Sequence, residues 1–320
     1  MSDQPTVLLL HTIAATSWAD PDEIRAEIEG RVPDADVRVA WTPPNSRELI
    51  PDAEVVVSSF LPSDLLAAAE RLEWVQALSA GVDFYDHETL AERGVVLTSA
   101  AGVHAEPIAE QVLGYVLAFE RGIHTGIRQQ SRNVWERYDG GEIRGKTLGV
   151  VGLGSIGGRV AEYGRAFDMT VVGTKRDPST APDAVDEAYG PDDLYEVLPR
   201  ADYLVVACPL TEETRGLLGP AELGALPTDA VLVNVARGEV VDEDALVYAL
   251  RQGSLGGAAL DVFEEEPHPS DSPLWDLSNV IVTPHMAGST PKKAGRIAEV
   301  FAQNYDAYTG VADSFVNREV

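Results

Sequence analysis

Short apolar runs rich in β-branched residues alternate with amphipathic segments along almost the whole chain. Runs of this kind predict β-strands, and they form one series in the first hundred residues and a second series between residues 147 and 285. The first series is TVLLL, ADVRVAW, AEVVVSSF, LEWVQAL and GVVLTS, and the second is TLGVVGL, MTVVGT, ADYLVVACP, AVLVNVA, GGAALDVF and NVIVTPH. The alternation predicts an α/β fold with two Rossmann-like or flavodoxin-like domains, each built on a parallel sheet.

Helical patterns fill the intervals between these strands. DPDEIRAEIEGRV and PSDLLAAAERL each begin with an acid near the capping position. The longest stretch, residues 104–138, is expected to form one helix whose apolar face comprises Ile108, Val112, Tyr115, Val116 and Phe119. A further helix, STPKKAGRIAEVFAQNYDAYTG, follows the last strand and is expected to return to the first domain. We therefore expect residues 1–100 plus 288–320 to form one domain and residues 101–287 to form another, whose six strands are the content of a dinucleotide-binding domain.

The charge balance narrows the range of partners. The chain of 320 residues has a formal net charge of -28, and its only lysines are Lys146, Lys175, Lys292 and Lys293. Its acids are spread along the chain instead of forming a tail, which favours a haloadapted, strongly hydrated surface over a segment that recognises cationic partners. No basic stripe is present to neutralise phosphates, which argues against nucleic-acid binding.

The cysteine count and the N-terminus bear on the cellular setting. Cys208 is the only cysteine, so neither an intrachain disulfide nor a thiolate metal cluster is possible, and we expect no metal. The apolar run from Val7 to Leu10 resembles a first strand, not a signal peptide, because no basic segment precedes it. No run of about 18 apolar residues occurs, so no membrane span is expected. We expect a cytoplasmic protein.

A glycine-rich turn follows the first strand of the second series. GLGSIG, from Gly152 to Gly157, fits the dinucleotide-binding pattern G-x-G-x-x-G. Gly152 permits the tight turn, Gly154 lets the backbone approach a pyrophosphate, and Gly157 lets strand and helix pack closely. Amide groups at the start of the next helix would face the phosphates. The strand before the turn and the helix after it favour a dinucleotide site over a flexible surface loop.

Two cations stand where an NAD site normally has an acid. The strand MTVVGT ends beside Lys175 and Arg176, whereas an NAD-specific site has Asp or Glu there for the ribose hydroxyls. A Lys–Arg pair attracts the additional 2′-phosphate of NADP, which a guanidinium can bind through two hydrogen bonds. The alternative is a solvated pair in a turn, which the following Asp177 and Pro178 would suit. We expect NADP(H) to be preferred, with NAD(H) also possible.

Chemically capable side chains stand at the ends of three later strands. Arg237 directly follows AVLVNVA, Asp261 and Glu266 lie in GGAALDVFEEEP, and His285 ends NVIVTPH. The carboxyl ends of parallel strands share one edge of a sheet, where open α/β folds bind their ligands. A lone histidine at such a position is more often structural than catalytic. Arg237 also has nearby acids with which it could simply pair, namely Glu239, Asp242 and Glu243.

Six stretches of the chain resemble one family of enzymes. They are LSAGVD (78–83), GKTLGVVGLGSIG (145–157), CPLTEETRGLLG (208–219), NVARGEVVDEDAL (234–246), GAALDVFEEEP (257–267) and TPHMAGST (283–290). In this order they resemble the D-2-hydroxyacid dehydrogenases, which include D-lactate, glycerate/hydroxypyruvate and phosphoglycerate dehydrogenases. The resemblance implies a substrate-binding domain over residues 1–100 plus 288–320 and a dinucleotide-binding domain over residues 101–287, with substrate and nicotinamide held in the cleft between them.

The resemblance also implies a role for each matching residue. Arg237 would bind the substrate carboxylate, and His285 would exchange a proton with the carbonyl oxygen. Glu266 would hydrogen-bond that imidazole and favour its charged form. The choice of Glu266 over Glu264 and Glu265 rests on the match to EEEP, because the chemistry alone leaves all three open.

Further residues follow from the same resemblance. The residues expected to bind substrate are Ala80, Gly81 and Val82, through their backbone amides, together with Arg237 and His285. The residues expected to bind the cofactor are Gly152, Gly154, Ser155, Ile156, Gly157, Lys175, Arg176, Cys208, Pro209, Thr214, Ala236, Asp261 and Gly288, with Asp261 at the nicotinamide end.

Motifs and resemblance together predict an NADP(H)-preferring D-2-hydroxyacid dehydrogenase that reduces 2-keto acids. We expect a homodimer, because the family usually dimerises through the nucleotide domain, with the long helix over 104–138 as the contact. One alternative is an enzyme of the same build that acts on formate or phosphite. The other is a nucleotide-sensing corepressor, because proteins of that kind share this architecture.

Overall fold

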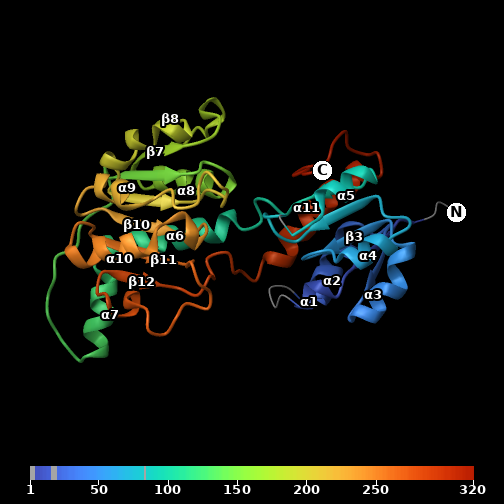
Figure 1. The fold of residues 1–320 in the computed structure, drawn as a ribbon, viewed down its shortest axis with the longest axis horizontal. Coiled ribbons are helices and arrows are strands. Elements are labelled where there is room, and N and C mark those ends of the chain that lie inside the picture. Colours follow the sequence, from blue (N-terminus) through green and yellow to red (C-terminus); the bar gives the residue numbers. More distant parts are fainter. Residues whose placement is uncertain (1–3, 16–19, 83) are drawn as a thin grey trace. The chain divides into compact units, whose positions relative to one another are not determined.

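The chain folds into two compact units, each with its own parallel sheet (Figure 1). The structure, a computed structural model, describes residues 4–15, 20–82 and 84–320. The first unit comprises residues 1–103 and 290–320, and the second comprises residues 104–289. Asp83, the last residue of LSAGVD, lies outside the described residues. The predicted α/β class with two parallel sheets is confirmed.

The sheet of the first unit contains all the strands predicted in the first hundred residues. They are β1 (Thr6–Leu9), β2 (Asp36–Val39), β3 (Val55–Ser58), β4 (Trp74–Ala77) and β5 (Val96–Thr98). Their order is β2-β1-β3-β4-β5 with every pair parallel, which is the flavodoxin-like order. The helices between them are α1 (Thr12–Ala15), α2 (Pro21–Arg31), α3 (Pro43–Leu49), α4 (Ser63–Ala68) and α5 (His87–Glu92).

The last helix, α11 (Lys293–Tyr308), also belongs to the first unit. Its buried face carries Ile297 and Phe301. The Phe301 ring stacks on the indole of Trp74 in β4, with the ring centroids 4.9 Å apart. Burial of these large side chains fixes the end of the chain to the sheet.

The sheet of the second unit has the Rossmann strand order with one strand added at an end. Its strands are β6 (Thr147–Val151), β7 (Thr170–Thr174), β8 (Glu187–Tyr189), β9 (Tyr203–Val206), β10 (Val231–Asn234), β11 (Gly257–Leu260) and β12 (Val280–Val282). The order is β12-β11-β10-β9-β6-β7-β8, and all neighbours are parallel. The chain moves outward from β6 to β8 and then returns to the other side of β6 as β9. The switch point of the sheet therefore lies between β6 and β9.

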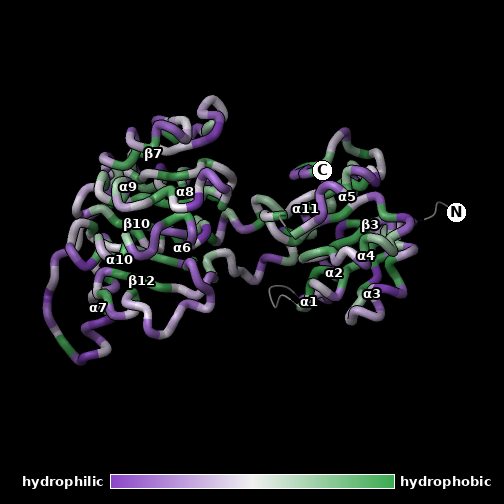
Figure 2. Tube along the Cα trace, viewed as in Figure 1, coloured by the Kyte–Doolittle hydropathy of each residue, from purple (hydrophilic) through white to green (hydrophobic). Residues whose placement is uncertain are grey.

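Helices surround this second sheet. They are α6 (Ala105–Glu120), α7 (Ile123–Ser131), α8 (Ser155–Ala166), α9 (Pro220–Ala225) and α10 (Glu243–Gln252). Shorter 3-10 turns occur in both units, at Ile50–Asp52, Pro178–Thr180, Pro191–Glu196, Leu198–Arg200, Gly238–Val240 and Pro273–Asp276. Figure 2 shows hydrophobic strands inside each unit and hydrophilic loops around them. Among the described helices, none is long and apolar enough to cross a membrane.

The long amphipathic stretch forms two helices, so the prediction of one helix over 104–138 is wrong. α6 ends at Glu120, α7 begins at Ile123, and residues 132–138 are not helical. Gly122 between them has a left-handed φ of 62°. A Cβ at this position would lie 2.6 Å from the Tyr138 ring. The turn thus needs glycine both for its backbone conformation and for the close approach of the tyrosine.

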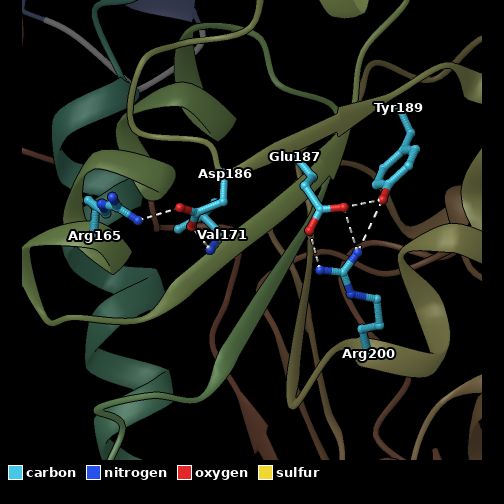
Figure 3. A network of polar contacts seen from close by, with 6 residues as sticks. All are labelled: Arg165, Val171, Asp186, Glu187, Tyr189 and Arg200. Carbon is cyan, nitrogen blue, oxygen red and sulfur yellow. Dashed lines mark hydrogen bonds and ion pairs between the residues drawn. The ribbon is translucent and has the colours of Figure 1, made fainter.

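Strand β8 lies at the edge of the second sheet and is not among the strands predicted from the sequence. Polar contacts hold it there (Figure 3). The guanidinium of Arg200 donates to both carboxylate oxygens of Glu187, at 2.6 and 3.1 Å. Hydrogen bonds from Arg200 and then from Tyr189 lower the pKa of Glu187 to about 2. At the start of the strand, Arg165 forms an ion pair with Asp186. The charged contacts therefore add to the pairing of the edge strand with β7 and to the packing of Ala188 and Tyr189 on the cores.

Candidate active site

The glycine turn lies at the switch point of the second sheet. Gly152 follows β6 and has a φ of 98°, and a Cβ there would lie 2.7 Å from the backbone nitrogen of Cys208. Cys208 comes two residues after the end of β9, so the loops that follow these neighbouring strands touch at this point. A Cβ at Gly157 would lie 2.1 Å from the Gly152 carbonyl oxygen. Neither position can hold a larger residue without displacement of the backbone.

The position of Gly154 fits a bound diphosphate. Apart from the neighbours of Gly154 in the sequence, no described residue has an atom within 4 Å of the place where a Cβ of Gly154 would stand, so the backbone is open to a ligand there. Helix α8 begins with Ser155 and Ile156, and its N-cap residue, Gly154, has no side chain to bond the first amide groups. Uncapped amides and the helix dipole favour an anion at this end of the helix. The turn and helix could therefore hold the diphosphate of a dinucleotide cofactor.

Lys175 and Arg176 follow the end of β7. The Lys175 amide donates to the Tyr189 carbonyl in β8 at 2.9 Å, which ties the basic pair to the edge strand. The ammonium group of Lys175 donates to the Thr180 carbonyl at 2.7 Å. Within the described part of the chain, the Arg176 guanidinium makes no hydrogen bond and no ion pair. A hydrogen bond with the Thr211 side chain lowers the pKa of the Glu213 carboxyl group. The positive charge of Arg176 lies close enough to lower this pKa further.

His285 and Glu266 form a direct pair. The Nδ1 atom of His285 lies 2.7 Å from Oε2 of Glu266. The other carboxylate oxygen of Glu266 accepts the Phe263 amide at 3.0 Å, which fixes the orientation of the carboxylate. Glu264 faces elsewhere, because its carboxylate accepts the Glu243 amide at 3.2 Å. Among the three consecutive acids, Glu266 is therefore the one that contacts the imidazole.

The turn that carries His285 is held by a buried carboxylate. His285 has a left-handed φ of 48°, which non-glycine residues seldom adopt. Its amide donates to the Asp261 carbonyl at 2.8 Å. The Asp261 carboxylate, only 2% exposed, accepts the amides of Met286 at 3.0 Å and Ala287 at 2.8 Å. Asp261 therefore bonds to donors of its own chain and fixes the backbone next to the imidazole.

Arg237 lies beside the same segment. It follows β10, is exposed, and donates from Nη1 to the Ala236 carbonyl at 2.6 Å. A Cβ at Gly238 would lie 1.9 Å from the carbonyl carbon of Phe263, so the backbone after Arg237 packs directly on the segment that orients Glu266. The structure thus brings the guanidinium and the imidazole–carboxylate pair to one edge of the sheet.

The acids near Arg237 in the sequence have other partners. Glu239 forms an ion pair with Arg215 at 3.7 Å. Asp242 accepts the Ala245 amide at 2.9 Å and caps α10. Glu243 accepts the Glu264 amide at 3.4 Å. Among the described residues, none of these acids pairs with Arg237, which leaves its exposed guanidinium available for a ligand.

The other residues predicted to bind the cofactor lie in loops after the strands of the second sheet or stabilise these loops. Burial raises the pKa of the Cys208 thiol to about 11, so it is a small neutral group beside the glycine turn. The Thr214 hydroxyl donates to the Pro209 carbonyl at 2.7 Å and stabilises the loop after β9. Ala236 is 7% exposed. The Gly288 carbonyl accepts the Nδ1 hydrogen of His104 at 3.1 Å.

The residues expected to supply backbone amides to the substrate lie in the first unit. Ala80, Gly81 and Val82 follow β4 in the first unit, at the carboxyl end of its sheet.

Tyr115 and Thr283 belong to the site region but were not predicted from the sequence. Their hydroxyls bond to each other, and the Thr283 hydroxyl donates to Asp261. Thr283 could have been found from its place in TPH, two residues before His285. Tyr115 gave no signal except its place on an apolar helix face.

The geometry defines a class of protein. A sheet of Rossmann order carries an open glycine turn at its switch point and an imidazole–carboxylate pair at the same edge. Dinucleotide cofactors bind at this edge, and an imidazole held by a carboxylate suits proton exchange beside them. These features are those of a dinucleotide-dependent oxidoreductase.

Comparisons with known proteins identify the family. The family model for the NAD binding domain of D-isomer specific 2-hydroxyacid dehydrogenases matches residues 113–287. Glyoxylate reductase from Aeropyrum pernix is 35% identical over 313 residues, which are 92% of this chain and 92% of that protein. D-3-phosphoglycerate dehydrogenase from Methanocaldococcus jannaschii is 39% identical over 277 residues, which are 83% of this chain and 52% of that protein. The chain belongs to the D-isomer specific 2-hydroxyacid dehydrogenase family.

A solved structure agrees with this assignment over the whole chain. A D-isomer specific 2-hydroxyacid dehydrogenase from Xanthobacter autotrophicus Py2, in complex with NADPH and MES, has a TM-score of 0.83 to this structure and 29% sequence identity. The match covers 99% of this chain and 98% of that one. The named relatives are dehydrogenases and reductases, so the protein is an oxidoreductase with a nicotinamide cofactor. They give no support to the corepressor alternative.

Proposed function

We propose that the protein is an NADP(H)-preferring reductase that converts 2-keto acids to D-2-hydroxy acids, with His285 as acid and base. One observation carries the proposal: the 2.7 Å contact between His285 and Glu266 stands at the same sheet edge as the open glycine turn. Reduction of a 2-keto acid needs a proton for the carbonyl oxygen and a cation for the carboxylate. The chain offers an imidazole for the first and a guanidinium for the second.

The chemistry divides among three side chains. When bound at the glycine turn, a reduced nicotinamide cofactor would supply the hydride. The Nδ1 atom of His285 is committed to Glu266, so the proton for the carbonyl oxygen would come from Nε2. Glu266 stabilises the imidazolium before transfer and keeps the ring in one orientation. The Arg237 guanidinium would grip the substrate carboxylate with two hydrogen bonds and so orient the carbonyl group.

The remaining assignments belong to the same proposal. The exposed Arg176 guanidinium and the neighbouring Lys175 would bind the 2′-phosphate of NADP, because they directly follow β7, where an NAD-specific site has an acid for the ribose hydroxyls. The first unit would supply the amides of Ala80, Gly81 and Val82 to the substrate carboxylate. The second unit would bind the dinucleotide.

A spectrophotometric screen tests the proposed function. Purified protein is mixed with NADPH or NADH and with glyoxylate, hydroxypyruvate, pyruvate, and branched or aromatic 2-keto acids. We expect oxidation of NADPH with at least one 2-keto acid, a lower kcat/KM with NADH, and a product of D configuration on a chiral column. Glyoxylate leads the series because a relative is a glyoxylate reductase. Activity with formate or phosphite, but with no 2-keto acid, would overturn the proposal.

We also infer a homodimer that forms through the second unit. Exposed apolar side chains gather on α7 and the segment after it, where Ile127 is 61% exposed and Trp135 97% exposed. A groove of about 610 Å³ lies between α6, α7 and β12, with Tyr115 and Met286 among its lining residues. A second copy of this chain would cover the apolar side chains and the groove together, and buried tryptophans often dominate the energy of such contacts.

Replacement of Trp135 tests this inference. Trp135→Ser is expected to weaken self-association by about 10-fold or more, because a tryptophan at the centre of an interface is a typical hot spot. Sedimentation equilibrium measures the effect, with Tyr248→Ser as the control, since Tyr248 is 67% exposed on α10. A monomeric wild-type protein, or equal association of both variants, would contradict the inference.

A further inference from the structure

A chain of hydroxyl groups leads from α6 to the turn that carries His285. The Tyr115 hydroxyl bonds to the Thr283 hydroxyl, and the Thr283 hydroxyl donates to a carboxylate oxygen of Asp261. The same carboxylate accepts the amides of Met286 and Ala287. Tyr115 and Asp261 are 4% and 2% exposed, so water competes little for these bonds.

The direction of these bonds follows from the donor count. A carboxylate can only accept, so the single proton of the Thr283 hydroxyl goes to Asp261. Thr283 then has only lone pairs to offer Tyr115, and the tyrosine must donate. Burial raises the pKa of Tyr115 above its usual value, which keeps that proton on the phenol at neutral pH. Gln111, one turn earlier on α6, also bonds to the phenol and helps to hold the ring.

The turn needs such support because its backbone is strained. His285 has a left-handed φ of 48° without being a glycine, and a conformation of this kind persists only where surrounding contacts impose it. The two amides after His285 both bond to Asp261, so a shift of that carboxylate would move the turn and the imidazole with it. The geometry with Glu266 at 2.7 Å would then loosen.

We propose that Tyr115 is a positioning residue for the His285–Glu266 pair, acting through Thr283 and Asp261. Tyr115 touches neither the imidazole nor Glu266 in any contact described above, and its effect passes through three consecutive hydrogen bonds. The proposal rests on the proposed acid–base role of His285. It gives the buried Asp261 a function beyond the cofactor contact expected from the family resemblance, namely the support of the strained turn.

Removal of single hydroxyl or methyl groups tests the proposal. Tyr115→Phe and Thr283→Val each break the chain, whereas Thr283→Ser keeps the hydroxyl and should restore most of the activity. Tyr203→Phe is the matched control, because Tyr203 is also buried in the second unit and donates to Glu120 at 2.6 Å, away from the turn. Since Tyr115 and Thr283 line the groove assigned to a second copy, the oligomeric state of each variant is measured as well.

The expected result is a loss of turnover without a loss of binding. Tyr115→Phe should lower kcat about tenfold relative to Tyr203→Phe, because small displacements of catalytic groups reduce rates strongly, with little change in KM or in NADPH affinity. In the protein without cofactor or substrate, the amides of Met286 and Ala287 should exchange with deuterium about tenfold faster in Tyr115→Phe, and at the wild-type rate in Tyr203→Phe.

The two readouts separate this proposal from the proposed function. Unchanged exchange at Met286 and Ala287 in Tyr115→Phe would overturn the positioning role, as would a kcat equal to that of Tyr203→Phe in a protein that depends on His285. If His285→Ala retains full activity, the acid–base role fails. The exchange rates then still decide whether Tyr115 fixes the turn.

Discussion

Replacement of His285 by alanine is expected to lower kcat for 2-keto acid reduction by about 10³-fold, the contribution typical of a positioned proton donor. The carbonyl oxygen would then have to take its proton from water. NADPH affinity should stay close to that of the wild type, because the glycine turn and the basic pair follow other strands of the sheet. Steady-state kinetics measure the first effect, and a fluorescence titration with NADPH measures the second.

Two further variants make this result specific. Glu266→Gln should reduce kcat about tenfold, because the amide can still bond to the imidazole but no longer stabilises its charged form. His11→Ala serves as the control, since His11 lies in the first unit and pairs with the Ser46 hydroxyl at 2.7 Å. Turnover of His285→Ala within about tenfold of the His11→Ala value would remove the imidazole from the mechanism.

Substitution of the two basic residues after β7 is expected to shift the cofactor preference from NADPH toward NADH. In Lys175→Asp with Arg176→Ser, the ratio of kcat/KM for NADPH to that for NADH should fall by about 10²-fold, because charge-assisted hydrogen bonds to the 2′-phosphate are lost and a repulsive charge is introduced. The aspartate can also accept hydrogen bonds from the ribose hydroxyls of NADH. Initial rates with both cofactors and one 2-keto acid give the ratio.

A charge-matched control is available on the surface. Lys292→Asp with Arg251→Ser changes the net charge by the same amount at two exposed positions outside the proposed phosphate site. This control should leave the cofactor ratio unchanged. An unchanged ratio in the β7 variant, or an equal shift in both variants, would mean that Lys175 and Arg176 do not select the cofactor.

The sequence predicts the strands well because their patterns are strong. Parallel strands buried on both faces give continuous apolar runs, and each run identified in the two series forms a strand. β8 escaped prediction because it is a short edge strand, and the charged residues Asp186 and Glu187 at its start leave no apolar run in the sequence. The helix break at Gly122 escaped because the apolar spacing continues across it, while the left-handed backbone is visible only in three dimensions.

The part of the candidate site that follows directly from the ends of the strands could be predicted from the sequence. The carboxyl ends of β10, β11 and β12 place Arg237, Glu266 and His285 at one edge, which follows from topology alone. Tyr115 was not predictable, because its partner Thr283 is 168 positions away and a buried tyrosine on an apolar helix face looks like ordinary core. The strain at His285 depends equally on folded contacts.

The acidic composition predicts that the protein is adapted to high salt. Among the described acidic residues, Asp261 is buried as a whole and the Glu120 side chain is largely covered, whereas most of the others are exposed to solvent. A surface of this kind suits high salt, where screening reduces the repulsion between like charges. Thermal unfolding after dilution from molar salt into low salt tests this, and an unchanged Tm would count against haloadaptation.

A crystal structure with NADPH and oxamate, an unreactive 2-keto acid analogue, tests the central claim most directly. We expect Nε2 of His285 at about 3 Å from the amide carbonyl oxygen of oxamate, which stands in for the keto oxygen of a substrate, and the Arg237 guanidinium on its carboxylate. The 2′-phosphate should lie against Lys175 and Arg176. Oxamate bound beside the nicotinamide ring with the His285 imidazole turned away from it would contradict the account.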